Sequence, residues 1–439
     1  MRLGFSSKGI LSILFALYLC SYLLVNVSLI REICAFLFFG TAILIYIANK
    51  IVRIKAYFLL EFLFLIYGSL QLMAGIPTDV VASYKRLMII ATLFLINVGT
   101  FCYILYVDNF DRIIRVFTKT ILFSSVFLTF NFYKSILQDG RLTASDSSIS
   151  LLGPFWGGIS STGLSAIISI SFSFYYINYY QKENKLKFNF ITILHIVLLI
   201  LTGSRKVLLL VLVVMICVPF FNDKRAKVVK IIKYSLFAFL CLGGGYYIFM
   251  KVPYLYNAWG SRLESVVLFF TNGTVDDASI EARVGLISIA KQAYSEKPIF
   301  GWGLDNFVSV FTHGYYAHNN FWELLSTCGL VGFIIYYTRY LYLFKSLISI
   351  RKQSGYSEKA IINSYIIVFV ISVVMEYWQV TYFYSIIMVC FVLMIGHVEQ
   401  LKQTNKKNDI SVPDSIGTSS VITKNIPDNT KASQLNRFV

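Results

Sequence analysis

The 439-residue chain is 57% hydrophobic and only 14% charged, and it carries a formal net charge of +17. Soluble domains carry about 25% charged residues, so this composition excludes a soluble globular protein and indicates a membrane protein. The basic residues lie in short loops between apolar stretches, which indicates orientation in a bilayer rather than binding to nucleic acid.

About twelve stretches are long and apolar enough to span a bilayer as helices. In chain order they cover 10–30, 33–48, 56–75, 87–106, 119–137, 157–178, 188–203, 206–221, 234–252, 323–346, 361–378 and 380–397. Basic residues precede the first stretch and follow each even-numbered stretch up to the tenth. Because basic loops favour the cytoplasmic side, both termini are predicted to be cytoplasmic in a multi-pass protein of the cell membrane. The predicted fold is an all-α, polytopic transmembrane helical bundle.

Three segments interrupt the short connections. Residues 138–156 and 253–322 are predicted to face outward, and 401–439, rich in Lys, Asn, Ser and Thr, are predicted to form a disordered cytoplasmic tail after a transmembrane domain over 1–400. The long outward segment is expected to contain amphipathic helices over 261–270 and 279–295, the second ended by Pro298.

Two of the four histidines, His313 and His318, lie in this long outward segment. A neutral imidazole at His318, next to Asn319 and Asn320, could take a proton from a hydroxyl near neutral pH. The alternative is a histidine that begins a helix within an Asn-rich cap. His313 lies five positions before His318, which is poor spacing for two metal ligands on one helix face. The seven scattered cysteines have no CxxC spacing, so we predict no metal site.

Arginines are predicted to face outward at Arg141, Arg205 and Arg283. Guanidinium groups bind phosphate through two parallel hydrogen bonds, so convergent arginines suit a phosphorylated ligand. The alternative for each is an interfacial anchor beside the lipid headgroups. Arg205 and Lys206 lie in a very short outward turn, where positive charge runs against the inside bias and needs another explanation.

Three carboxylates, Glu61, Glu323 and Glu376, fall within or near predicted spans. Such groups are often functional, although the many Tyr hydroxyls could also satisfy them, so we assign them no role beyond lining a cavity. Gly243-Gly244-Gly245 is interpreted as a helix-packing site. The sequence contains no Walker-type loop and no Asp-x-Asp motif on a soluble domain, which favours an outward-facing reaction on an already activated, lipid-borne substrate.

Three motifs together resemble the O-antigen ligase and polymerase superfamily. The first runs from Arg283 through Pro298 and Gly301-Trp302-Gly303 to Phe307. The second is Ala317-His318-Asn319-Asn320 and the helix start that follows it, and the third is the Gly203-Ser204-Arg205 turn before a long aliphatic helix. The spaced Arg–Gly motif described for some polymerases is not matched between Arg141 and Gly153.

This resemblance implies a membrane glycosyltransferase of the GT-C type. Such enzymes transfer a glycan from an undecaprenyl diphosphate carrier on the outer face of the cytoplasmic membrane, without a metal or other cofactor. By position, Arg205 and Arg283 would neutralise the leaving diphosphate and His318 would act as general base. Substrate contacts are expected from the neighbouring polar residues Arg141, Lys206, His313, Asn319 and Asn320.

The preferred function is polymerisation of lipid-linked oligosaccharide repeat units into a capsular, exopolysaccharide or O-antigen chain. The expected partners are the lipid-linked oligosaccharide, membrane lipids, a flippase and a chain-length regulator, with no nucleic acid. A ligase that transfers the finished glycan to a lipid or protein is the first alternative, and a transporter or flippase is the second. A transporter predicts symmetric halves with polar residues near mid-membrane, whereas this chain concentrates Arg, His and Asn in one outward segment.

Overall fold

A computed structural model describes residues 6–49, 55–139, 142, 150–153, 155, 156, 159–183, 189–253, 256, 260, 264, 278–382 and 385–410. These residues are almost all helical, and the only β-type pairing among them is an isolated bridge between Val25 and Trp156. The described residues up to Gln400 belong to one compact unit, and the described residues from Leu401 to Ile410 belong to a second.

Each of the twelve predicted apolar stretches corresponds mainly to one helix. They are α1 (Ser7–Leu24), α2 (Ser28–Ala48), α3 (Ala56–Met73), α4 (Val80–Val107), α5 (Phe110–Asn131), α7 (Ser161–Glu183), α8 (Phe190–Thr202), α9 (Arg205–Asn222), α10 (Lys227–Lys251), α14 (Asn320–Gln353), α15 (Tyr356–Met375) and α16 (Ser385–Ile410). Among the described residues, eight helices are long and apolar enough to cross a membrane, and α8 and the Val207–Asn222 part of α9 are shorter apolar helices. The predicted all-α, polytopic helical bundle is confirmed.

Four further elements lie between these helices: α6 (Tyr133–Asp139), α13 (Ala278–Glu296), η3 (Phe307–Phe311) and η4 (Glu376–Trp378). The helix predicted over 279–295 is confirmed as α13. Of the helix predicted over 261–270, only Glu264 lies within the described residues. α16 continues to Ile410, beyond the predicted end of the transmembrane domain, and residues 411–439 lie outside the described part.

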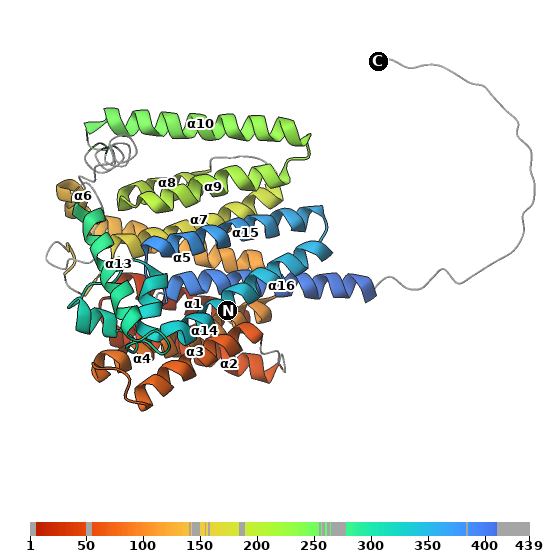
Figure 1. The fold of residues 1–439 in the computed structure, drawn as a ribbon. Coiled ribbons are helices and arrows are strands. Elements are labelled where there is room, and N and C mark those ends of the chain that lie inside the picture. The colour runs from red at the N-terminus through yellow and green to blue at the C-terminus, as the bar shows by residue number, and fades with distance from the viewer. Residues whose placement is uncertain are drawn as a thin grey trace, which may run out of the picture. The chain divides into compact units, whose positions relative to one another are not determined.

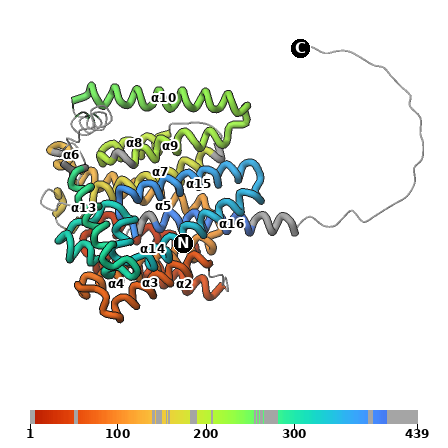
Figure 2. The backbone as a smooth tube through the Cα atoms, in the orientation of Figure 1, coloured from red at the N-terminus to blue at the C-terminus, as the bar shows by residue number. Residues whose placement is uncertain are grey.

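The long helices run side by side, and α6 and α13 are both seen at the same end of the bundle (Figures 1 and 2). Hydrogen bonds between connections and helix ends on the side predicted to face outward agree with this arrangement. They join Asn26 N to Phe155 O (2.8 Å), Leu142 N to Leu201 O (2.7 Å), Asp79 N to Asn306 Oδ1 (2.7 Å), and Thr381 N to Asn320 Oδ1 (2.8 Å). Segments far apart in sequence therefore meet at the end that carries α13.

Connections that we predicted to be cytoplasmic also bond to one another. Lys8 Nζ donates to Val107 O at 3.2 Å, and Tyr356 OH donates to Asp223 O at 3.1 Å. Each of these bonds joins two connections assigned to the same side by charge. The contacts thus sort the connections into the same two groups as the basic residues do.

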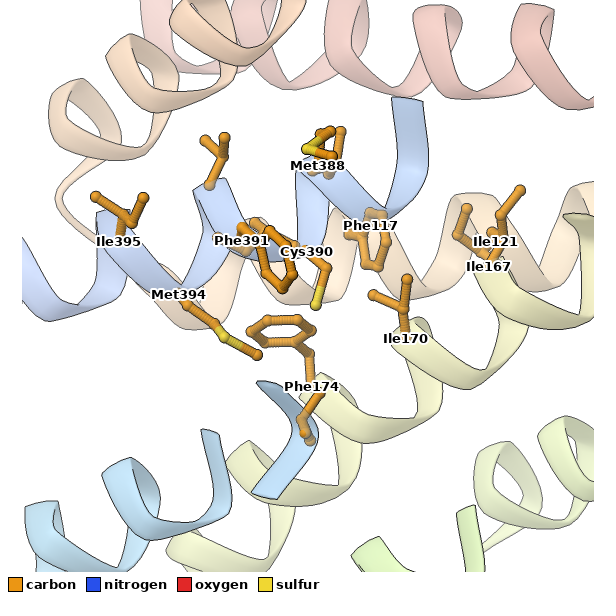
Figure 3. Packing of buried hydrophobic residues seen from close by; sticks show 14 of the residues in the cluster. Phe117, Ile121, Ile167, Ile170, Phe174, Met388, Cys390, Phe391, Met394 and Ile395 are labelled. Carbon is orange, nitrogen blue, oxygen red and sulfur yellow. The ribbon is translucent and has the colours of Figure 1, made fainter. Parts of the chain in front are cut away.

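The core lies where α5, α7 and α16 meet. Figure 3 shows Phe117 of α5 and Phe174 of α7 packed against Cys390 and Phe391 of α16. All four side chains are at most 1% exposed. Lipid is as apolar as these side chains, so close packing rather than exclusion from water holds such helices together.

The predicted packing role of Gly243-Gly244-Gly245 is not seen within the described chain. A Cβ added at Gly243 or Gly244 would meet nothing within 4 Å. α10 packs mainly against α9 and leaves most of its side chains exposed.

Candidate functional site

The segment after α13 docks into a break in α14. Gly329 has non-helical angles (φ 61°, ψ −172°) inside α14, so the neighbouring backbone groups lose their helical partners. The docked segment replaces those partners. Trp302 N and Gly303 N donate to the carbonyls of Ser326 (3.0 Å) and Thr327 (2.8 Å), and Leu330 N and Val331 N donate to those of Pro298 (2.8 Å) and Ile299 (3.2 Å).

The glycines of the Gly301-Trp302-Gly303 motif are required by this docking. Gly301, Gly303 and Gly329 all have positive φ, at 72°, 99° and 61°. A Cβ on Gly303 would lie 2.6 Å from Pro77 Cγ, in the connection between α3 and α4. Only glycine fits both the backbone angle and the close approach.

Side chains of α3 fasten the same junction. Gln71 Nε2 donates to Phe300 O at 2.5 Å, and Tyr67 OH donates to Cys328 O at 2.6 Å. Both side chains are buried, at 2% and 8% exposure. The docked segment is therefore held by α14 on one side and by α3 on the other.

Asn306 ties the next part of the segment to the start of α4. Its Oδ1 accepts the Asp79 N–H at 2.7 Å, and its Nδ2 donates to Ser83 Oγ at 2.7 Å and to Asp79 O at 3.1 Å. The side chain is fully buried. One amide thus satisfies backbone and hydroxyl groups that would otherwise be buried without partners.

A buried charged cluster lies beside this attachment. Arg86 of α4 is 7% exposed, and its Nη2 donates to Asp305 Oδ1 at 2.7 Å and to the Tyr316 hydroxyl at 2.9 Å. Glu323, in the first turn of α14, is fully buried, and its Oε2 accepts the Ala317 N–H at 2.8 Å. Glu323 interacts electrostatically with Asp305 and Arg86, so we name Arg86, Asp305, Tyr316 and Glu323 the charged cluster.

The Tyr316 hydroxyl stays protonated in this cluster. Burial raises its pKa above the ordinary value, and the positive charge of Arg86 opposes that rise. Tyr316 therefore binds Arg86 as a neutral acceptor.

His318 follows Tyr316 and Ala317 in the chain and is half-buried. Its φ of 52° lies in the left-handed region, which few non-glycine residues adopt. Asn319 begins α14, with its Oδ1 accepting the Trp322 N–H at 3.1 Å. Among the described residues its buried Nδ2 has no hydrogen-bond partner.

Asn320, a predicted substrate contact, has its amide fully engaged within the protein. Oδ1 accepts the N–H groups of Thr381 (2.8 Å) and Tyr382 (3.1 Å), and Nδ2 donates to the Tyr337 hydroxyl at 2.9 Å. The side chain is fully buried. We therefore interpret Asn320 as the residue that holds the start of α14 against the connection between α15 and α16.

Arg283 lies exposed on α13, on the face that carries Ile287 and Ala290 at helical spacing. Ala290 is fully buried and belongs to a small apolar cluster with Phe307 and Ala317. The face that carries Arg283 is therefore the face that packs toward the segment before His318. His313 is exposed, with a φ of 49°.

The remaining predicted site residues are only partly placed. Arg205 begins α9, directly after Gly203 (φ 67°) ends α8, but the side chains of Arg205 and Lys206 lie outside the described part. Arg141 is also outside it. Its neighbour Leu142 donates its N–H to Leu201 O at 2.7 Å, so this segment contacts the last turn of α8, directly before the turn that leads to Arg205.

Sequence reasoning missed Arg86 and Asp305, and it assigned Glu323 no specific role. The sequence feature that singled out Arg205 could also have singled out Arg86. It places a positive charge at the predicted outward end of a span, whereas basic residues favour the cytoplasmic side. Within the described residues, no group of three or more His, Cys, Asp or Glu side chains is arranged to hold a metal ion.

Residues 188–337 match the family model described as O-antigen ligase. This region is an O-antigen ligase family domain. Comparison with curated proteins found no matching relative. The match supports the expected resemblance to the O-antigen ligase and polymerase superfamily, whose members are membrane glycosyltransferase-like enzymes.

The O-antigen ligase domain extends from the connection before α8 to Tyr337 within α14. It therefore includes Arg205, Arg283 and His318, the three residues predicted to act in catalysis. It also includes Asp305, Tyr316 and Glu323 of the charged cluster, whereas Arg86 lies outside it, on α4.

Proposed function

We propose that this protein is a membrane glycosyltransferase that joins lipid-linked oligosaccharide repeat units into a surface polysaccharide. The donor is an undecaprenyl diphosphate-linked glycan on the outer face of the cytoplasmic membrane. The observation that carries the proposal is the O-antigen ligase domain, which contains the turn before α9, α13 and the His318 segment together.

The proposed reaction is a glycosyl transfer with a diphosphate leaving group. An acceptor sugar hydroxyl attacks the anomeric carbon of the donor, and His318 takes the hydroxyl proton. The bond from the anomeric carbon to the diphosphate oxygen breaks, and the diphosphate leaves with the electron pair. Arg205 and Arg283 hold its charge as it builds.

Both ends of this reaction suit the outward face of a membrane. The donor already carries an activated bond, so no nucleotide is needed at the site, in keeping with a sequence that has no Walker-type loop. Growth of the chain would require a flippase to supply the donor and would suit a chain-length regulator as a partner. Arg141, Lys206, His313 and Asn319 are proposed to contact the substrate around the three catalytic residues.

Ligation is the second candidate, and the similarity of residues 188–337 to the O-antigen ligase family favours it. A ligase would transfer a finished glycan to a different acceptor, a lipid or a protein, through the same leaving-group chemistry. We place polymerisation first because polymerases are the more diverse and more frequently met members of the superfamily.

The test is complementation of a deletion strain. Wild-type protein, His318→Ala, Arg283→Ala and Arg205→Ala are expressed at matched levels, and surface and lipid-linked glycans are resolved by chain length. Glu281→Ala is the control, because Glu281 is also exposed on α13 but carries the opposite charge.

Loss of a polymerase leaves single repeat units on the surface, whereas loss of a ligase leaves full-length glycan on the lipid carrier. We expect the first pattern for the three catalytic variants and wild-type chains for Glu281→Ala. Accumulated long lipid-linked glycan would replace polymerase with ligase. Full rescue by His318→Ala, Arg205→Ala and Arg283→Ala would overturn a catalytic function and leave transport as the better reading.

A further inference from the structure

The backbone at His318 is held in an unfavourable conformation. A histidine at φ 52° persists only where the surrounding structure enforces it. The residue before it, Ala317, is fully buried, and so is Asn319 after it. The contacts of these neighbours therefore fix where the imidazole can lie.

Arg86 fixes the chain two residues before His318. Its Nη2 bonds both Asp305 (2.7 Å) and the Tyr316 hydroxyl (2.9 Å), and its guanidinium carbon lies 5.7 Å from the centre of the Tyr316 ring. Asp305 and Tyr316 lie on either side of η3, so one guanidinium clamps both ends of that element. Arg86 belongs to α4, which gives the clamp a rigid base.

Glu323 fixes the residue directly before His318. Its carboxylate accepts the Ala317 N–H at 2.8 Å from a position one turn into α14. Glu323 N also bonds Asn319 O at 3.0 Å, which closes the first turn of α14 around the histidine segment. A buried carboxylate is expensive for the fold, and apolar replacements of buried charges are often neutral for stability. A functional role explains why a carboxylate stands here.

We propose that Arg86 and Glu323 are positioning residues that hold His318 in place for proton transfer. The proposal rests on the proposed function of His318 as general base. Arg86 acts through Tyr316 and Asp305, and Glu323 acts through the Ala317 N–H. Neither residue is assigned to the diphosphate, which Arg205 and Arg283 bind.

Because Arg86 and Glu323 act on the position of His318 and not on the donor, their loss should change kcat and leave KM unchanged. Displacement of a catalytic group by about 1 Å can cost about a hundredfold in rate. Loss of Arg86 or Glu323 should therefore lower kcat by about ten- to a hundredfold. KM for the lipid-linked donor should stay close to the wild-type value, because the donor contacts are intact.

Hydrogen–deuterium exchange of the full-length protein in nanodiscs tests the geometry without any activity. Glu323→Ala removes the acceptor of the Ala317 N–H, so peptides covering 312–322 should exchange about five- to tenfold faster. Glu323→Gln keeps a carbonyl oxygen for that N–H and should restore slow exchange. Glu61→Gln controls for a general loss of stability, because it also neutralises a buried carboxylate but lies on α3, bonded to Asn97 at 2.6 Å and paired with Arg339. Unchanged exchange in Glu323→Ala, or equal loosening in Glu61→Gln, would overturn the proposal.

Turnover of purified protein on a lipid-linked oligosaccharide supplies the second test. Glu323→Ala and Arg86→Met should lower kcat at constant KM. Glu323→Gln and Arg86→Lys should recover part of the lost kcat. Glu61→Gln should not lower kcat at constant KM. A fall in kcat matched by Glu61→Gln would reduce the two residues to general stabilisers of the fold.

His318→Ala is measured in parallel to separate the two proposals. If it retains full turnover, the role of His318 as base fails, whatever the other variants do. If it is inactive while Glu323→Ala and Arg86→Met behave as wild type, only the positioning proposal fails. If Glu323→Ala does not fold, Glu323→Gln and Arg86→Lys replace it in the test, and both should show an intermediate kcat. A wild-type kcat in Arg86→Lys and Arg86→Met would contradict the positioning proposal.

Discussion

Gly301 and Gly329 pack backbone against backbone, although one belongs to the segment after α13 and the other to the interior of α14. A Cβ on Gly301 would lie 2.5 Å from Gly329 N, and a Cβ on Gly329 would lie 2.6 Å from Gly301 N. Both residues have positive φ. The contact joins α14 to the segment that leads to His318, so it sets the frame of the candidate site.

Alanine at either glycine should destabilise the protein. Gly301→Ala and Gly329→Ala add a methyl group that only backbone movement can accommodate, and overpacking of this kind costs roughly 1–3 kcal/mol. The positive φ adds to that cost. Thermal unfolding in detergent, followed with a thiol-reactive dye, is a suitable measurement because Cys102, Cys328 and Cys390 are buried. Gly243→Ala is the control, since its Cβ would meet nothing within 4 Å, and it should unfold at or above the wild-type temperature. A wild-type midpoint for Gly301→Ala would contradict the close packing.

Asn306→Ala should loosen the attachment of the segment after α13 to the start of α4. The change leaves the Asp79 N–H and the Ser83 hydroxyl without their amide partner, and each buried unsatisfied group costs about 1–3 kcal/mol. We expect a lower unfolding temperature and faster proteolysis within 303–318. Thr338→Ala is the comparison, because that hydroxyl bonds only to Ile334 O of its own helix (2.7 Å). Equal proteolysis of both variants would argue against the role of Asn306.

Removal of one member of the ion pair between Glu61 and Arg339 should lower the stability of the protein more than removal of both. Arg339 Nη1 lies 3.5 Å from Glu61 Oε1, and both side chains are at most 4% exposed. Removal of one partner leaves a buried charge uncompensated, which typically costs about 3–5 kcal/mol. Arg339→Met should therefore be strongly destabilised, and Glu61→Gln combined with Arg339→Met should regain much of the loss. Unfolding midpoints of the single and double variants decide it, and a double variant that is worse than both single variants would refute the pairing argument.

Asp223 should make the connection between α9 and α10 sensitive to acid. Arg225 donates to this carboxylate through Nε (3.0 Å) and Nη2 (2.8 Å) and lowers its pKa to about 2. An unfolded Asp titrates near pH 4, so the stabilisation is complete above about pH 4 and is lost as the pH falls toward 2. Asp223→Asn should lack this component, so its unfolding midpoint should fall less than that of the wild type between pH 4.5 and about 2.5. Parallel curves for the two proteins would show that the pair does not couple to folding.

The helices, and the division of their connections into two groups, could be predicted because each depends on local sequence. A continuous apolar stretch forms a helix in lipid wherever it occurs, and a basic loop favours one side whatever its distant neighbours are. For the same reason α13 could be predicted from its own periodicity, and Pro298 from its inability to continue a helix. Arg283 and His318 became candidates through motifs that are likewise contiguous in the chain.

The charged cluster could not be predicted because Arg86 is remote in sequence from its other three members. Arg86 and Asp305 are 219 positions apart, and no local sequence pattern at either residue indicates the other as its partner. The break at Gly329 shows the same limit, since the sequence predicts an uninterrupted helix there. Its non-helical angles are tolerated only because the segment 298–303 satisfies the exposed backbone groups.

The sequence by itself therefore determined a helical membrane bundle, its two faces and the family motifs. Only the tertiary structure decided which polar groups share a buried site. Local chain propensity and hydrophobicity act along the sequence, whereas the partner of a buried charge is chosen by the packing of whole helices, and burial makes that choice obligatory.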